Sequence, residues 1–196
     1  MAKKIAIFRG HPDPQTNHFC DAILASYQSG AIQSGHEVRF IDVAALEFDV
    51  LRTRADWESG VTPKGLVEAQ EAIFWADHLV FAYPLWLGTM PALFKAFLEQ
   101  VLRSQLNKGG VEGNPIEWRK LLKGASARIF VTMGMPAFFY RAFYRAHGLK
   151  VLERNILGLI GVKPVRSTIY GMIENVSDAK RQSWLNLACK LGREAR

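Results

Sequence analysis

The stretch at positions 82–99 reads Ala-Tyr-Pro-Leu-Trp-Leu-Gly-Thr-Met-Pro-Ala-Leu-Phe-Lys-Ala-Phe-Leu-Glu, and it decides the fold. It follows a strand-forming run that begins at Asp77 and ends abruptly at Pro84. An amphipathic helix is expected to begin near Pro91, because proline is favoured at the first position of a helix. In an open parallel sheet, a loop between such a strand and helix lies at the edge where α/β proteins bind ligands.

This loop has two interpretations. It combines a flat aromatic side chain, Trp86, with the backbone N–H groups of Leu87, Gly88 and Thr89. Such a set can lie along the edge of a planar, electron-poor ring and donate hydrogen bonds to its heteroatoms. The alternative is a tight strand-to-helix turn in which Trp86 only caps the core. A short motif does not by itself separate the two.

Composition indicates an ordinary globular protein of one domain, covering residues 1–196. Hydrophobic residues make up 49% of the chain and charged residues 22%. No apolar run approaches the ~20 residues that cross a bilayer, and the amino-terminal residues do not resemble an export signal. Cys20 and Cys189 are far apart and lack metal-ligand spacing. We therefore expect free thiols, no metal site and a reducing, cytoplasmic location.

The net charge of +7 has several possible causes. Basic proteins bind nucleic acid, or attract anionic substrates and cofactor phosphates. Here the basic residues are scattered, no run of five or more exists, and no helix-turn-helix or zinc-finger pattern is present. The sequence therefore disfavours nucleic acid as a partner and favours a basic surface that attracts a phosphorylated dinucleotide.

Apolar runs and helical spacings alternate along the chain. Strands are expected at residues 3–8, 36–41, 79–83, 127–132 and 165–170. Helices are expected at residues 19–33, 64–75, 91–106, 138–159 and 178–193, with residues 43–63 forming an irregular connection. Thr16 or Asn17 is the natural N-cap of the first helix. Gly148 and Gly158 are the expected break points of the fourth.

This alternation predicts an α/β fold with a five-stranded parallel sheet and helices on both faces. The second strand carries polar residues on one face, which places it near an edge of the sheet. Three loops converge at the carboxyl ends of the strands, at residues 10–17, 84–90 and 133–140. Any ligand site is expected there.

The first of these loops lacks the glycine pattern of a dinucleotide-binding turn and that of a nucleoside-triphosphatase loop. It offers instead His11, Thr16, Asn17 and His18 at the start of a helix. Side-chain donors and the free N–H groups of a helix N-terminus favour a phosphate group. Ordinary helix capping with solvent-exposed histidines is the alternative.

Read together, the loops resemble those of the flavodoxin-like NAD(P)H:quinone oxidoreductase family. This family includes DT-diaphorase, the modulator-of-drug-activity proteins and the ancillary reductases of potassium-efflux systems. The resemblance extends from residue 5 to about residue 171, and the motif after the third strand is its most specific part. The residues that carry it are His11-Pro12, Pro84-Leu85-Trp86-Leu87-Gly88, Met90-Pro91-Ala92-Leu93-Phe94-Lys95, Thr132-Met133-Gly134, Tyr140 and His147-Gly148.

The resemblance implies a flavodoxin-like three-layer sandwich that binds a flavin, FMN or FAD. The flavin phosphate or ribityl chain would be held by residues of the first loop, namely His11, Thr16, Asn17 and His18. The isoalloxazine would be lined by Pro84, Leu85, Trp86 and Leu87, and its opposite edge closed by Thr132, Met133 and Gly134.

The resemblance also places Tyr140 and His147 beside the flavin, where they would stabilise negative charge on the reduced ring and relay a proton. Histidine suits this role because its pKa is near neutrality. In the alternative interpretation, Tyr140 is one more aromatic residue of its helix and His147 lies on the surface.

The function predicted from these residues is reduction of quinones or similar planar acceptors by NAD(P)H through two-electron, ping-pong hydride transfer. The resemblance further implies a homodimer with active sites at the subunit interface. Two alternatives stay open: a flavoprotein regulatory partner of a membrane transporter, and a one-electron carrier of the flavodoxin type. The positive net charge fits the carrier poorly, because such carriers are usually acidic.

Overall fold

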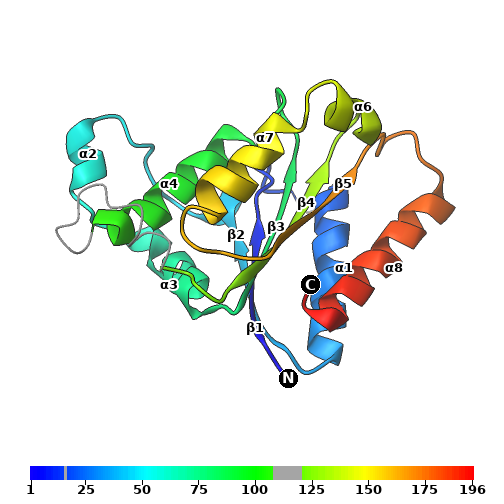
Figure 1. Ribbon diagram of the computed structural model, residues 1–196, viewed down its shortest axis with the longest axis horizontal. Helices are drawn as coiled ribbons and strands as arrows, with labels where there is room; N and C mark the ends of the chain where they lie inside the picture. Colours follow the sequence, from blue (N-terminus) through cyan, green and yellow to red (C-terminus); the bar gives the residue numbers. More distant parts are fainter. Residues whose placement is uncertain (16, 108–120) are drawn as a thin grey trace.

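The computed structural model describes residues 1–15, 17–107 and 121–196. Within these residues, five parallel strands form one sheet in the order β2-β1-β3-β4-β5 (Figure 1). The strands are β1 (Lys4–Arg9), β2 (Glu37–Asp42), β3 (His78–Pro84), β4 (Ser126–Thr132) and β5 (Val165–Tyr170). The predicted α/β fold is confirmed, and β2 lies at a sheet edge as expected.

Helices cover both faces of the sheet (Figure 1). One face carries α1 (Phe19–Gln33) and α8 (Asp178–Glu194). The opposite face carries α3 (Val67–Trp75), α4 (Ala92–Asn107), α7 (His147–Lys150) and the π-helix that continues α7 (Val151–Leu157). Shorter elements are α2 (Arg54–Glu58), α6 (Ala137–Ala142) and two 3₁₀ turns (Val43–Ala45 and Lys64–Leu66).

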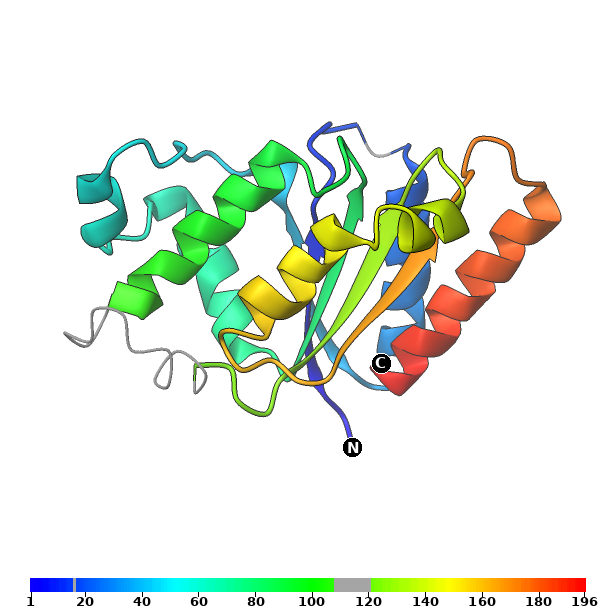
Figure 2. The same cartoon turned by 45° about the horizontal axis from the view of Figure 1, so that its top comes forward.

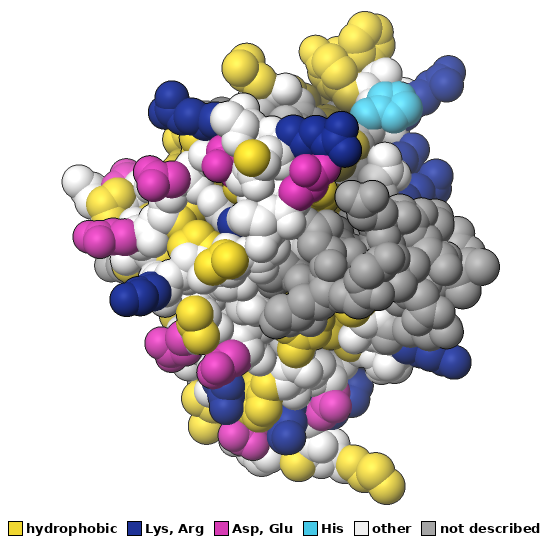
Figure 3. Space-filling model, turned by 90° about the vertical axis from the view of Figure 1, so that its left-hand side faces the viewer, with side chains coloured by type: hydrophobic (Ala, Val, Ile, Leu, Met, Phe, Trp, Pro, Cys, Tyr) yellow, Lys and Arg dark blue, Asp and Glu magenta, His cyan; other side chains and the backbone are white. Residues whose placement is uncertain are grey.

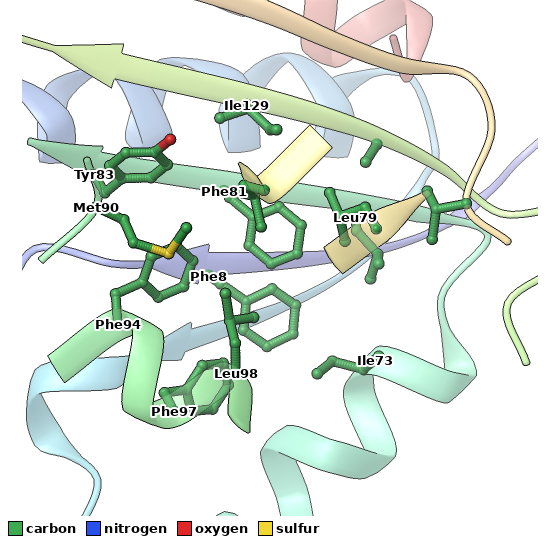
Figure 4. Close-up of a cluster of buried hydrophobic side chains, with 14 of the residues drawn as sticks. Phe8, Ile73, Leu79, Phe81, Tyr83, Met90, Phe94, Phe97, Leu98 and Ile129 are labelled. Carbon is green, nitrogen blue, oxygen red and sulfur yellow. The ribbon is translucent and has the colours of Figure 1, made fainter. Parts of the chain in front are cut away.

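The core between the sheet and α4 is built of aromatic side chains (Figure 4). Phe8 of β1 stacks on Phe81 of β3 with ring centroids 5.3 Å apart, and Phe94 and Phe97 of α4 pack against them. Buried aromatic rings contribute large apolar areas and favour such offset and tilted contacts. This packing fixes where α4 begins, and hence where the loop before it lies.

On the other face, α1 and α8 approach closely through two glycines. A Cβ added to Gly30 of α1 would lie 2.0 Å from the carbonyl oxygen of Cys189 in α8. A Cβ added to Gly192 of α8 would lie 2.0 Å from the carbonyl oxygen of Tyr27 in α1. The two helix backbones are therefore in direct contact, and only glycine fits at either crossing point.

Three local predictions are wrong. His18, and not Thr16 or Asn17, is the N-cap of α1, and the Asp21 carboxylate accepts its backbone N–H at 2.9 Å. Residues 43–63 contain α2, which is held by a capping box between Thr53 and Asp56. Residues 64–66 form a 3₁₀ turn before α3.

The predicted helix at 138–159 is also divided differently. The break lies at residues 143–146, between α6 and α7, and not at Gly148. Arg145 and Ala146 both have a φ of +50°, a left-handed conformation that ends a helix. A new helix begins at His147. Its continuation from Val151 to Leu157 has π-type hydrogen bonding.

Neither cysteine forms a disulfide: Cys20 is buried and Cys189 half-buried. In the described ranges, no helix combines the length and apolar character needed to cross a bilayer. Nor do the described His, Cys, Asp and Glu side chains form a group that could hold a metal ion.

Candidate functional site

The strand order brings two loops together between β1 and β3. β1 pairs with β2 on one side and with β3 on the other, so the chain leaves β1 and β3 in different directions. The loops that follow these strands lie side by side at the carboxyl edge (Figure 2), and Gly10 donates its N–H to the Ala82 carbonyl at 2.8 Å. This reversal in strand order is where open α/β sheets bind ligands.

The loop after β1 contains a stacked pair of histidines. The rings of His11 and His18 lie 3.7 Å apart at 13°, and the Trp86 indole meets His11 edge-on at 6.3 Å. Asp13 joins the pair, because its carboxylate lies 3.0 Å from His18 Nε2 and accepts the N–H of Gln15 at 2.9 Å. The loop therefore presents its imidazoles as one rigid unit.

The surroundings of this pair shift two pKa values. Burial, the neighbouring His18 and the Arg9 guanidinium lower the pKa of His11. The backbone hydrogen bond from Gln15 lowers the pKa of Asp13. At neutral pH, Asp13 is thus ionised and His11 neutral. Asn17 is exposed beside them, whereas Thr16 lies outside the described residues.

The loop after β3 is a two-residue hairpin. Trp86 and Thr89 exchange backbone hydrogen bonds of 2.9 and 3.1 Å, and the φ angles of Leu87 and Gly88 are +46° and +84°. Positive φ at both central residues is the pattern of a type I′ turn. A leucine in this conformation costs about 1 kcal/mol. The hairpin leaves Trp86 51% exposed and Leu87 fully exposed.

These contacts bear on the two interpretations of the loop. Trp86 is half-exposed and does not cap the core. The set of free backbone donors is smaller than predicted, because the Thr89 N–H donates to the Trp86 carbonyl within the turn. Among the described contacts, the N–H groups of Leu87 and Gly88 have no partner. Pro84 and Leu85 are half-buried behind the hairpin, and the Leu85 N–H is bonded to the Thr132 carbonyl at 2.8 Å.

The loop after β4 offers space but few polar groups. The Thr132 hydroxyl is buried and lies 3.1 Å from the Cys20 thiol, whose pKa burial raises to about 12. Met133 is buried, and its N–H is bonded to the Tyr170 carbonyl. Gly134 is exposed, and a Cβ added there would meet nothing within 4 Å. Of the three predicted residues, Gly134 alone lies open to a ligand.

Tyr140 connects the hairpin to α7. Its side chain is buried, its hydroxyl donates to the Gly88 carbonyl at 3.2 Å, and it accepts the Leu149 N–H at 3.1 Å. Burial raises the pKa of this phenol, so that it stays protonated. The structure therefore shows Tyr140 as a link that holds the hairpin in place.

His147 begins α7 and is exposed at the same edge, which leaves its imidazole accessible to solvent and ligand. Directly after it, Gly148 touches the hairpin. A Cβ at this position would lie 2.0 Å from the Gly88 carbonyl oxygen and 2.6 Å from the Thr89 Cα. The hairpin and α7 thus have backbone contact as well as the Tyr140 bridge.

Comparison with known proteins now adds to this geometry. A family model described as a flavodoxin-like fold matches residues 3–188. The chain belongs to this flavodoxin-like family. The predicted flavodoxin-like sandwich is therefore confirmed, with the strand order 2-1-3-4-5 that is typical of such proteins.

Three similar proteins illustrate the family. The chain is 24% identical over 188 residues to an uncharacterised NAD(P)H oxidoreductase of Haemophilus influenzae, which covers 94% of this chain and 91% of that one. It is 32% identical over 115 residues to FMN-dependent NADH:quinone oxidoreductase 1 of Hahella chejuensis, and the match covers 58% of this chain and 51% of that protein. The solved structure of Smu.1420 from Streptococcus mutans is 30% identical in sequence and superposes with a TM-score of 0.74. The superposition covers 97% of this chain and 98% of that one. The resemblance to the flavodoxin-like NAD(P)H:quinone oxidoreductase family is confirmed.

Two residues of the site were missed by sequence reasoning. Arg9 ends β1 with its side chain 2% exposed, and Asp13 organises the histidine pair. The turn residues around Asp13 were a signal, because an Asp between two prolines favours side-chain bonding to nearby backbone. Arg9 gave none, since an arginine at a strand end is most often solvated.

Proposed function

We propose that this protein is a flavin-dependent NAD(P)H oxidoreductase that reduces quinones or similar planar acceptors by two-electron transfer. One observation carries the proposal: the half-exposed Trp86 hairpin and the stacked histidine loop meet where the strand order reverses. The names of the Haemophilus and Hahella relatives support the same chemistry.

The residues at this edge fit a flavin nucleotide. Asn17 is exposed and His18 is the N-cap at the N-terminus of α1, and the free N–H groups of a helix N-terminus suit an anionic group. The Leu87 and Gly88 N–H groups suit the heteroatoms of a flat ring, and no atom lies within 4 Å of a Cβ built at Gly134, which leaves that backbone open to a ligand. We infer that FMN is the nucleotide, which is supported by the FMN-dependent Hahella relative.

The chain contributes position, exclusion of water and proton exchange. Bound flavin supplies the hydride-accepting and hydride-donating chemistry. Trp86 offers an apolar surface to the ring, and Tyr140 fixes the hairpin that carries Trp86. The exposed imidazole of His147 offers a proton donor and acceptor at this edge.

The absorption spectrum of the purified protein tests the proposal. We expect bands near ~450 nm that bleach with NADPH or NADH and return when a quinone is added. Chromatography of the released flavin then distinguishes FMN from FAD. Flavin that is bound but not reduced by either nucleotide would indicate a carrier or regulatory partner, and failure to take up added FMN or FAD would end the flavin proposal.

We also propose that the protein is a cytoplasmic homodimer, as the family resemblance implies. Phe138, Phe139, Phe143 and Tyr144 are exposed at the carboxyl edge, and the Phe139 and Phe143 rings stack at 5.1 Å. Figure 3 shows hydrophobic side chains gathered at the upper edge of one face, beside a histidine. Patches of this kind mark interfaces. Light scattering should give twice the 22.0 kDa chain mass, and Phe143→Glu should return the monomer mass. A wild-type monomer would contradict the proposal.

A further inference from the structure

The buried Arg9 side chain connects four parts of the chain. Its Nε donates to Asp21 of α1 at 2.6 Å, and its Nη1 donates to Asp42 of β2 at 3.1 Å. The same guanidinium donates to two backbone carbonyls of the loop after β1, those of His11 at 3.2 Å and Gln15. Its planar fork of donors suits this arrangement, which a lysine ammonium cannot reproduce.

These bonds determine the shape of the loop after β1. His11 and Gln15 lie on either side of Asp13, so Arg9 fixes both ends of the segment that carries the Asp13 carboxylate. Asp21 uses its other oxygen to accept the His18 N–H, so the same network also sets the first turn of α1. The histidine stack and the helix N-terminus are thereby held in one arrangement.

Arg9 also balances the charge of this region. Asp13, Asp21 and Asp42 place three carboxylates around the loop, and each would repel a phosphate group. The Arg9 guanidinium pairs directly with two of them in a buried setting, where charges are weakly screened. Without it, the loop would present net negative charge to an anionic ligand.

We propose that Arg9 is a positioning residue for the phosphate of the flavin nucleotide: it holds the loop and neutralises the carboxylates that would otherwise exclude an anion. The inference rests on the proposed function, since it needs the flavin to bind at this edge. Arg9 acts through the loop and is not itself a catalytic residue.

The ratio of two affinities tests this role. FMN carries the phosphate and riboflavin lacks it, so both are titrated into the apoprotein of the wild type and of Arg9→Lys and Arg9→Met, with binding followed by flavin fluorescence. We expect wild type to prefer FMN, and both variants to lower the FMN-to-riboflavin affinity ratio by about tenfold or more. Arg9→Lys keeps the charge and serves if Arg9→Met does not fold.

Arg103 provides the matched control. It is also a buried arginine that clamps a loop, donating to the carbonyls of Asp56 and Val61 from α4. Arg103→Lys should weaken folding while leaving the affinity ratio unchanged. An unchanged FMN-to-riboflavin affinity ratio in the Arg9 variants would overturn the inference about Arg9 but not the proposed function. If the wild type bound FMN and riboflavin with equal affinity, the loop would not bind the phosphate, and the inference about Arg9 would be wrong. If the wild type bound neither flavin, the proposed function itself would be wrong.

Discussion

Gly148→Ala should separate the hairpin at residues 86–89 from α7 and weaken flavin binding at least tenfold. The added Cβ would lie 2.0 Å from the Gly88 carbonyl oxygen, and that neighbour is backbone that cannot rotate away. Overpacking of this kind costs about 1–3 kcal/mol, which exceeds the gain of about 1 kcal/mol that alanine normally brings to a helix. Denaturant unfolding and flavin titration would measure the two effects.

Two further variants serve as controls for Gly148→Ala. Gly134→Ala adds the same methyl group in open space and should leave the unfolding free energy unchanged. Tyr140→Phe removes the hydroxyl between Gly88 and Leu149 and should cost about 1–2 kcal/mol. If Gly148→Ala were as stable as wild type and bound flavin equally well, contact with α7 would not determine the hairpin position.

Acid should destabilise the protein through His78. This side chain is fully buried at the start of β3, its Nδ1 lies 2.7 Å from the Ser126 hydroxyl, and its Nε2 has no partner in the described residues. Burial, together with the nearby Lys3, Arg128, Arg166 and His36, lowers the pKa of His78 to about 3. The folded protein therefore holds this imidazole neutral.

The sign of the pH effect follows from these values. The unfolded chain binds a proton below a pKa of 6.5, whereas the folded chain does not until pH falls to about 3. Stability is therefore complete above pH 6.5 and declines by about 1.4 kcal/mol per pH unit below it, reaching a loss of about 2 kcal/mol at pH 5.

Unfolding free energies measured between pH 7.5 and pH 4.5 check this expectation. His78→Asn keeps an acceptor near Ser126 and lacks a titrating ring, so its stability should depend less on pH than that of wild type. His147→Asn, at an exposed position, is the control and should follow the wild-type curve. Parallel curves for His78→Asn and wild type would show that another group causes the acid sensitivity.

Much of the fold could be predicted from sequence because three of its strands, β1, β3 and β4, are buried runs between turn residues. The predicted bounds of β5 agree with the structure, and those of α1 differ only in the identity of its N-cap. The runs of β1, β3 and β4 could be placed directly, since a continuous apolar segment must enter the core. The edge position of β2 could also be predicted, because a strand that carries charged residues along it cannot be buried on both faces in the middle of the sheet.

Other elements could not be read from hydrophobic spacing. All of α2 is exposed except for contacts at its ends, so no apolar face signals it, and the capping pair Thr53 and Asp56 was its only sign. The aromatic residues at 138–144 favour one continuous helix by spacing. The left-handed Arg145 and Ala146 interrupt it, next to the segment that Tyr140 bonds to the hairpin, and residue spacing does not signal such a break.

The site shows the same division. Sequence placed Trp86, His11 and His18 at one edge, because strand ends in a parallel sheet must meet there. It did not reveal that the Thr132 hydroxyl turns toward Cys20, or that Tyr140 is engaged by Gly88 and not free. Side-chain direction at a strand end depends on which helix covers each face, which residue spacing alone does not specify.

The glycine contacts between α1 and α8 bear on how the chain folds as it is synthesised. Helix α1 is synthesised long before its close-packed neighbour α8, because the two helices lie far apart in the sequence. Until α8 has been synthesised, the α1 side of the sheet lacks the helix that packs against Tyr170 of β5. Helix α1 therefore lacks its packing partner until α8 has been synthesised, and a ribosome that stalls before α8 leaves an apolar face exposed to chaperones and proteases.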